Sequence, residues 1–239
     1  MKVGRHEQSS REAGTFLLVD KPLDWTSFDV VAKVRNAYHR AGLKCKVGHC
    51  GTLDPKASGL LILATGRKTR EIADLEILDK VYEGVIRLGA VTESHDPETP
   101  EYGHCDTAHL DPEVISKTAM SFVGPSLQQP PMHSAAWHKG KRLYEFARKG
   151  EVVKERKARE IMIHRFEITS VALPDVVFEL AVSKGAYVRV IAHEFGKALG
   201  VGGYLASLRR TAIGPYSIGA SRSVQETVDA IVRQPKEVD

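Results

Sequence analysis

The stretch VGHCGTLDPKASGLLILATG, residues 47–66, places a single carboxylate between a glycine-rich loop and an apolar run. The apolar run, GLLILAT at 59–65, predicts a buried strand. Asp54 directly precedes Pro55, and a proline restricts the backbone of the residue before it. A carboxylate held in this way can be exposed and rigidly aimed, which suits a nucleophile or a general base. The pattern alone leaves open a second and more frequent role, in which Asp54 only makes an Asx turn with its own backbone.

The composition of the 239-residue chain is that of an ordinary globular protein, with 42% hydrophobic and 27% charged residues. No apolar run approaches the roughly 20 residues of a membrane span, and residues 1–14 contain no apolar stretch typical of a signal peptide. We expect these residues to form a flexible tail and the protein to be cytoplasmic, without a membrane partner. Three cysteines cannot all pair internally, which favours a reducing compartment, and their spacing matches no compact zinc motif.

Hydrophobic periodicity and turn residues predict an order of strands and helices that is not a strict βαβ alternation. Strands are predicted at residues 15–22, 59–65, 80–90, 159–173 and 176–185. Helices are predicted at residues 28–42 with Ser27 as the N-cap, 68–75, 111–124, 141–149, 187–200, within 202–214, and at 224–233. Residues 43–58 and 93–111 are predicted as loops. This order favours an α+β fold with a mixed, largely antiparallel sheet flanked by helices.

Positive charge is concentrated in one segment. Residues 139–159 contain nine Lys or Arg and three Glu, a local net charge of +6 in a chain whose net charge is +4. Aromatic residues lie among the basic ones in KGKRLYEFARKG, residues 139–150. Such a segment can follow a phosphate backbone, but a solvated helix face has the same composition. The charge pattern alone therefore leaves nucleic-acid binding undecided.

Two further stretches carry candidate functional side chains. In SKGAYVRV, residues 183–190, Arg189 lies where a strand is predicted to turn into a helix. An arginine there can hold a carboxylate in its ionised form through a bidentate pair. In DKVYEG, residues 79–84, Tyr82 can stack on a base or fill the core. For a lone aromatic residue in a strand, core packing is the more frequent role.

Taken with DKPLDWTS (20–27), QQPPMHSA (128–135) and LRRTAIGPY (208–216), these motifs resemble the bacterial tRNA pseudouridine synthase B (TruB) family. The resemblance runs from about Thr15 to Gly219, with the motifs in the family's order. It implies the pseudouridine synthase fold, with a catalytic domain at residues 15–221. Residues 222–239 then form a C-terminal helix and tail, without the full PUA-like RNA-binding domain that many relatives carry.

The resemblance also implies a reaction. Members of the family convert uridine to pseudouridine at position 55 in the T loop of tRNA, on a flipped-out nucleotide and with no cofactor or metal. Asp54 matches the catalytic nucleophile, and Arg189 matches the arginine that pairs with it. Tyr82 matches the tyrosine that stacks on the uracil and assists proton removal at C5.

Other positions match the substrate-binding part of the family pattern. His49 matches a residue that fills the space vacated in the RNA loop, and Lys21 matches a lysine near the floor of the site. The expected substrate and RNA contacts are His49, Lys21, Gly51, Thr52, Tyr187, Leu208, Arg209, Lys139 and Arg142. The expected partner is the T-arm stem-loop of tRNA, bound by a monomer that needs no other protein. The chain departs from the usual pattern at Asp24, Arg70, His133, Trp137 and Ala186.

Two other functions remain as alternatives to a tRNA-modifying enzyme that acts alone. One is an RNA-binding protein that helps tRNA to fold and in which catalysis is minor. The other is a pseudouridine synthase that acts on another RNA, either directly or guided by a small RNA within a larger particle.

Overall fold

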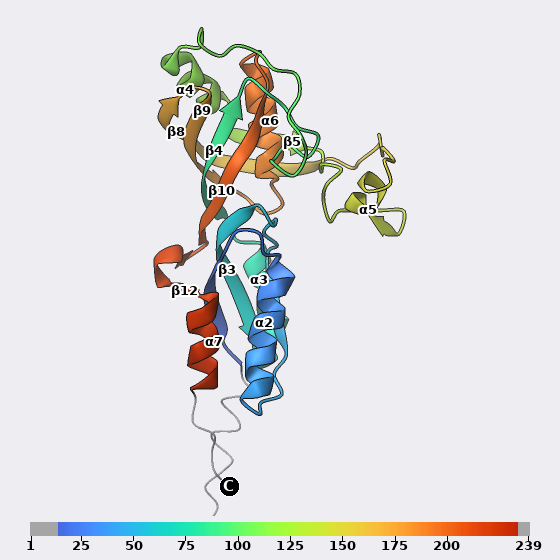
Figure 1. Cartoon of the computed structure of the whole chain (residues 1–239), viewed down its shortest axis with the longest axis vertical. Coiled ribbons are helices and arrows are strands. Elements are labelled where there is room, and N and C mark those ends of the chain that lie inside the picture. The colour runs from blue at the N-terminus through green and yellow to red at the C-terminus, as the bar shows by residue number, and fades with distance from the viewer. Residues whose placement is uncertain (1–13, 234–239) are drawn as a thin grey trace, which may run out of the picture. The chain divides into compact units, whose positions relative to one another are not determined.

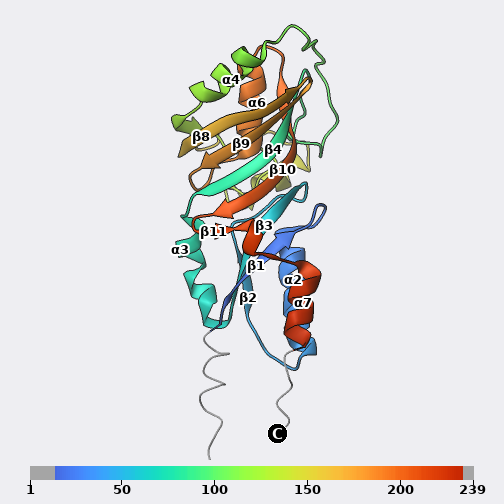
Figure 2. The same ribbon diagram turned by 90° about the vertical axis from the view of Figure 1, so that its left-hand side faces the viewer.

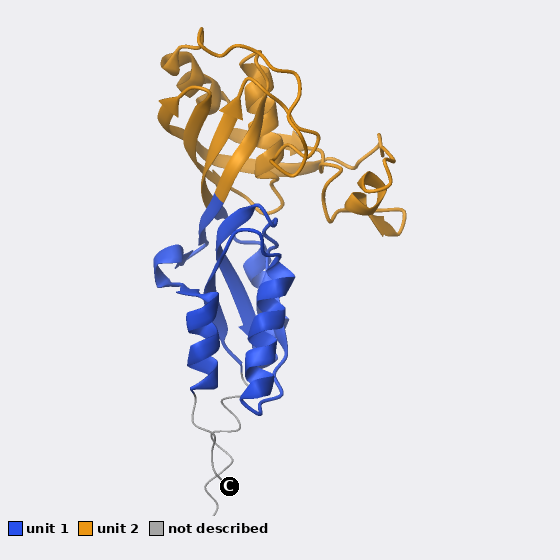
Figure 3. Ribbon diagram, in the orientation of Figure 1, with its two compact units in different colours: residues 1–80, 209–239 blue, residues 81–208 orange. Residues whose placement is uncertain are grey.

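The computed structural model describes residues 14–233, so nearly all of the predicted tail at 1–14 lies outside the described residues. The chain divides into two compact units (Figure 3). Unit 1 comprises residues 1–80 and 209–239, and unit 2 comprises residues 81–208. The divisions fall within two strands, β4 (Lys80–Leu88) and β10 (Gly203–Ile213). Within residues 14–233, no helix is both long and apolar enough to cross a bilayer.

Unit 1 is built around β3 (Ala57–Thr65), the apolar run of the opening stretch. β3 pairs antiparallel with β1 (Phe16–Lys21) and with β2 (Val47–Cys50), and β1 pairs in parallel with β12 (Arg222–Ser223). The remaining elements of this unit are η1 (Gly66–Glu71), β11 (Tyr216–Ser217) and η2 (Ile218–Ala220). β2 lies in the region predicted as a loop, because its four residues are too few to show a clear alternation.

Both faces of β3 are covered, which explains its continuous apolar sequence. Leu61 and Leu63 face the helices α2 (Ser27–Arg40) and α7 (Val224–Val232), which lie side by side (Figure 2). Leu60 and Ile62 face the opposite side, where α3 (Ile72–Glu76) packs. The loop that follows β2 is therefore anchored at the edge of a rigid two-sided core.

Unit 2 has the strand order β10–β4–β9–β8–β5. β5 (Gly124–Gln128), β8 (Arg159–Ala172) and β9 (Asp175–Val182) are antiparallel neighbours, and β8 and β9 meet at the turn predicted around Pro174. The helices α4 (Pro112–Ser121) and α6 (Val188–Ala198) cover the sheet, with Phe195 packed against Phe166. A short hairpin of β6 (Trp137–His138) and β7 (Lys141–Arg142) leads into α5 (Leu143–Ala147), which stands apart from the sheet of its unit (Figure 1).

Two local predictions were wrong. Residues 202–214 contain no helix and form β10, because pairing within a sheet overrides the helix propensity of its Leu, Ala and Arg residues. In unit 2 the start of β10 lies directly against α6, since a Cβ on Gly196 would come within 2.3 Å of the Gly203 nitrogen. The N-cap of α2 is Thr26 and not Ser27. Asp29 completes a capping box with Thr26, which releases the Ser27 hydroxyl for another contact.

The predicted α+β class, with a mixed sheet and flanking helices, is confirmed. The alternation predicted at 80–90 and 159–185 also gives strands as expected.

Candidate active site

Ser27 fixes the residue immediately before Asp54. Its hydroxyl accepts a hydrogen bond from the Leu53 N–H at 2.9 Å and donates one to the Leu53 carbonyl at 3.2 Å. Ser27 and Leu53 are both buried. Because the Ser27 hydroxyl satisfies both backbone groups of Leu53, the chain reaches Asp54 in one defined direction.

The residues after Asp54 are held by the turn that precedes α2. The Asp24 N–H donates to the Pro55 carbonyl at 2.9 Å, and the Asp24 carboxylate pairs with Lys56 at 2.7 Å. The family resemblance implies a glycine at position 24, and the φ of Asp24, 62°, lies in the left-handed region. Aspartate tolerates this region better than most residues, so the departure at this position preserves the turn.

Arg210 holds the start of the same loop from inside unit 1. This arginine is only 1% exposed. Its guanidinium donates to the Gly51 carbonyl at 3.0 Å and to the Leu60 carbonyl at 2.8 Å. At Gly59 a Cβ would lie 2.3 Å from the Arg210 carbonyl, so only glycine lets the two backbones meet. Arg209 was among the predicted contacts and Arg210 was not, although neighbouring residues of a strand point to opposite faces.

Lys21 lies in the same electrostatic environment as Asp54. Its side chain is fully buried, and the ammonium donates to the carbonyls of Pro22 (2.8 Å) and Trp25 (2.6 Å). Burial lowers the pKa of Lys21 to about 8, while the negative charges of Asp54 and Asp24 act in the opposite direction. The structure thus brings together Lys21 and the carboxylate that the resemblance assigns as the nucleophile.

Three other predicted RNA contacts lie in unit 1. His49 is in β2, and burial lowers the pKa of its imidazole, which favours the uncharged ring. Thr52 is exposed in the Asp54 loop. Arg209 pairs with Asp20 at 2.6 Å through one guanidinium nitrogen. His49 and Thr52 are close to Asp54 in the sequence, and Arg209 belongs to a strand of the same sheet. Leu208, another predicted contact, belongs to unit 2 and is buried.

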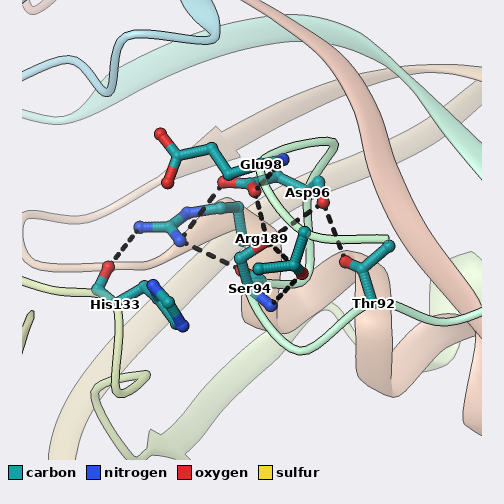
Figure 4. Close-up of polar contacts among 7 residues, drawn as sticks. Thr92, Ser94, Asp96, Glu98, His133 and Arg189 are labelled. Carbon is teal, nitrogen blue, oxygen red and sulfur yellow. Dashed lines mark hydrogen bonds and ion pairs between the residues drawn. The ribbon is translucent and has the colours of Figure 1, made fainter. Parts of the chain in front are cut away.

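Arg189 lies in unit 2, at the start of α6 (Figure 4). Its side chain is buried and contacts the Asp96 carboxylate at 3.3 Å. The guanidinium also donates to the carbonyls of Ser94 (3.0 Å) and His133 (2.9 Å). These contacts fix the direction of the guanidinium. The predicted pair between Arg189 and Asp54 joins residues of different units and stays a prediction.

Asp96 is a site residue that the sequence did not predict. Residues 93–111 were predicted as a surface loop, yet Asp96 and Ser94 are both buried. The Asp96 carboxylate accepts hydrogen bonds from the Ser94 hydroxyl at 2.5 Å and from the Glu98 N–H at 3.0 Å (Figure 4). These two donors and the Arg189 guanidinium fix the position of the buried Asp96 carboxylate. Nothing in the local sequence around Asp96 indicates a partner 93 residues away.

The two predicted tyrosines of unit 2 differ in environment. Tyr82 lies in β4 and is 8% exposed, so the burial is compatible with both roles that its position suggested. Tyr187 directly precedes α6. Its backbone N–H donates to the Gln128 side chain at 2.6 Å, and its carbonyl accepts from the same amide at 3.1 Å. Gln128 therefore ties the QQPP segment to the start of the helix that carries Arg189.

The basic segment contains an exposed aromatic surface. Trp137 is 63% exposed, and the Arg142 guanidinium lies over its ring, 4.0 Å from the centroid. Lys139 forms the tip of the same hairpin, in the left-handed region at φ 45°. In α5 the Arg148 guanidinium lies 5.1 Å from the ring centroid of Tyr144. Cations stacked on aromatic rings form a surface that can bind both phosphates and bases.

The possible metal ligands do not gather in one place. Cys50 is buried, Cys45 is partly buried and Cys105 is exposed, and none of them forms a disulfide. Within residues 14–233, no group of three or more His, Cys, Asp or Glu side chains is arranged to hold a metal ion.

Comparison with known proteins identifies the family. The model of the TruB family pseudouridylate synthase N-terminal domain matches residues 37–188. The chain is 67% identical to the tRNA pseudouridine synthase B of Chlorobium chlorochromatii, over 96% of this chain and 91% of that protein. It is 66% identical to the tRNA pseudouridine synthase B of Chlorobaculum tepidum, over 93% and 92% of the two chains.

A solved structure supports the fold. The crystal structure of a Cbf5-Nop10-Gar1 complex matches with a TM-score of 0.72 at 28% identity. The match covers 94% of this chain and 56% of the other chain. The fold implied by the sequence motifs is thus confirmed, and the chain belongs to the TruB family of pseudouridylate synthases.

Proposed function

We propose that the protein converts uridine to pseudouridine at position 55 in the T loop of tRNA, with Asp54 as the nucleophile. The observation that carries the proposal is the Asp54 loop, in which Ser27, Asp24 and Arg210 fix the backbone on both sides of the carboxylate. The relatives that match over more than nine-tenths of this chain are tRNA pseudouridine synthases B, which supports tRNA as the substrate.

The reaction breaks the N1–C1′ glycosidic bond, turns the uracil and rejoins it to the sugar through C5. The N1–C1′ bond is replaced by a C5–C1′ bond, and the proton on C5 is lost while N1 gains one, so no outside reagent is consumed. Asp54 must be ionised to attack. We infer that Arg189 pairs with it, and that Lys21 adds positive charge from the floor of the loop.

Tyr82 and the basic segment have separate roles in this proposal. Tyr82 stacks on the flipped uracil, which offsets part of the few kcal/mol that flipping costs. His49 fills the place of the flipped nucleotide in the RNA loop. Gly51 and Thr52 line the approach to Asp54. Tyr187 supports the site from the residue before α6, and Leu208 and Arg209 support it from β10. Lys139, Arg142 and the rest of the segment 139–159 contact the T-arm phosphates by shape and charge rather than by sequence.

A pseudouridine synthase that acts within a larger particle is the second candidate. The match to a chain of the Cbf5-Nop10-Gar1 complex favours it, since that structure is of an assembly. Sequence identity favours a tRNA pseudouridine synthase. It is 67% to the Chlorobium chlorochromatii enzyme and 28% to the chain of the Cbf5-Nop10-Gar1 complex. We propose that the protein is a cytoplasmic monomer that acts alone, with a catalytic domain at residues 15–221.

The test is tritium release from a T-arm hairpin labelled at C5 of its uridines. Stoichiometric release from the target uridine is expected with purified protein alone. A hairpin with cytidine at the target position and the same flanking sequence is the matched control, and it should release none. Tight hairpin binding without release would contradict the proposal and favour the tRNA-folding alternative. Release only after addition of a guide RNA would favour the particle.

A further inference from the structure

Two histidine rings without a role in the proposed reaction lie stacked in unit 2. The ring of His95 lies parallel to that of His193, with centroids 4.0 Å apart and planes 1° apart. His95 belongs to the turn after β4, and His193 belongs to α6. The Nδ1 atom of each ring is buried and has no hydrogen-bond partner. No hydrogen bond from Nδ1 therefore fixes either ring, and the contact is made by ring faces.

The pair lies beside the contacts of Arg189. His95 stands between Ser94, whose carbonyl accepts from Arg189, and Asp96, whose carboxylate pairs with Arg189. On α6, His193 follows Arg189 by four residues, so the two side chains share one face of the helix. The ring stack and the contacts of Arg189 therefore join the same two segments, the Ser94–Asp96 turn and α6. On α6 the two contacts are one helical turn apart.

We propose that the stacked rings of His95 and His193 hold the Ser94–Asp96 turn at one position along α6. The turn then fixes the direction of the Arg189 guanidinium, so the two histidines form a positioning pair for Arg189. The inference rests on the proposed function, in which Arg189 pairs with the nucleophile. The pair acts through Arg189 and does not touch the uridine.

The backbone of the turn needs such support. His95 has a φ of 61°, in the left-handed region, where residues other than glycine persist only when their surroundings fix them. Its carbonyl accepts from the Leu205 N–H of β10 at 3.0 Å, and its N–H donates to the Thr92 carbonyl at 3.2 Å. These bonds hold the backbone of the turn, and the ring stack is the contact that joins His95 to α6.

The surroundings of His95 favour the uncharged form of its ring. Burial, the largest cause, and the nearby basic groups His193, Arg189, Arg156 and His133 together lower the pKa of His95 to about 4. At neutral pH the ring is therefore uncharged and can lie face to face with its neighbour. The pair works as an aromatic contact in this state and needs no proton transfer.

The variants are placed at position 193, because a helix accepts residues that the left-handed backbone of His95 would not. His193→Ala removes one ring face, and His193→Phe keeps an aromatic face while it removes both nitrogens. His109→Ala, at an exposed histidine of the same unit, is the matched control. The readouts are single-turnover tritium release from the T-arm hairpin with saturating protein, and the Kd of the same hairpin.

We expect His193→Ala to slow release about fivefold, the loss of one aromatic contact of ordinary strength, with an unchanged Kd. His193→Phe and His109→Ala should remain within about twofold of the wild type. A wild-type rate in His193→Ala would overturn the positioning role while leaving the proposed function intact. Absence of release by the wild-type protein would refute the proposed function and this inference with it.

A double variant separates positioning from mere packing. An Arg189→Lys variant keeps the positive charge but replaces the planar guanidinium, whose donors have fixed directions, with a compact ammonium group. The rate of this variant should therefore depend little on the direction of the side chain. Adding His193→Ala there should change the remaining rate by less than about twofold, because residues that act through one another are not additive. A further full fivefold fall would show that the pair acts independently of Arg189, and would overturn the inference.

Discussion

Replacing Ser27 with alanine tests whether the Asp54 loop is held as the structure indicates. Ser27 is 2% exposed, and its single hydroxyl satisfies both the N–H and the carbonyl of Leu53. Its removal leaves two buried backbone groups without this partner, and an unsatisfied buried group costs about 1–3 kcal/mol. Alanine returns about 0.5 kcal/mol as the better helix former. The two groups together cost about 2–6 kcal/mol, so the net loss expected in the free energy of unfolding is about 1.5–5.5 kcal/mol.

The loss should also reach the chemistry, because Leu53 is joined directly to Asp54. We expect the midpoint of urea unfolding to fall and the single-turnover rate of tritium release to fall about tenfold, since small displacements of a reacting group slow a reaction sharply. The control is Ser116→Ala in α4, where the hydroxyl donates to the Pro112 carbonyl at an exposed position. A Ser27→Ala protein with the wild-type midpoint and the wild-type rate would refute the idea that Ser27 holds the loop.

Three further predictions concern charge. Arg189→Ala should slow single-turnover release by about 100-fold or more, as loss of a preorganised charge at a reacting group does; a fall below tenfold in a protein that remains folded would contradict the proposed pair with Asp54. Reversing the charges of Lys154, Arg156, Lys157 and Arg159 should weaken hairpin binding and flatten its dependence on salt, measured by titrations at several salt concentrations; an unchanged slope would exclude phosphate contacts there. Lys21 has a pKa of about 8 in the folded protein against 10.5 normally. The unfolded chain therefore holds the proton to higher pH, so the stability of the wild type should rise relative to Lys21→Met between about pH 8 and pH 10.5. Equal trends in urea midpoints would show that Lys21 is not buried as described.

Local patterns predicted the elements whose signals lie within a few residues. The run at 59–65 is β3, and its lack of alternation reflects the helices on both of its faces. The alternation at 80–90 and 159–185 likewise gave strands at the expected places. In these segments the residue pattern and the burial agree, so the sequence alone was sufficient.

The failures share a physical reason, which is dependence on distant partners. β10 was predicted to contain a helix because Leu, Ala and Arg favour helices, and only its place in the sheet makes it a strand. Arg210 and Asp96 are buried charges whose partners lie far away in the sequence. The choice of Thr26 over Ser27 as the N-cap of α2 depends on Leu53, which needs the Ser27 hydroxyl.

The predictions for the site show the same difference between local sequence patterns and contacts with distant residues. The motif order identified the family, which the comparisons confirm. The roles of Asp54, Tyr82 and Arg189 follow from that resemblance and stay predictions. What the structure adds is the set of residues that hold two of them: Ser27, Asp24 and Arg210 around Asp54, and Asp96, Ser94 and His133 around Arg189.

The most direct test of the account compares the wild-type protein with Asp54→Asn on one T-arm hairpin, with tritium release and hairpin affinity measured in parallel. Asparagine keeps the size of the side chain and removes the charge that attacks. We expect release by the wild type, release at or near background by Asp54→Asn, and similar affinities for the two proteins. Release by Asp54→Asn at a rate near that of the wild type would contradict the central claim that this carboxylate performs the reaction.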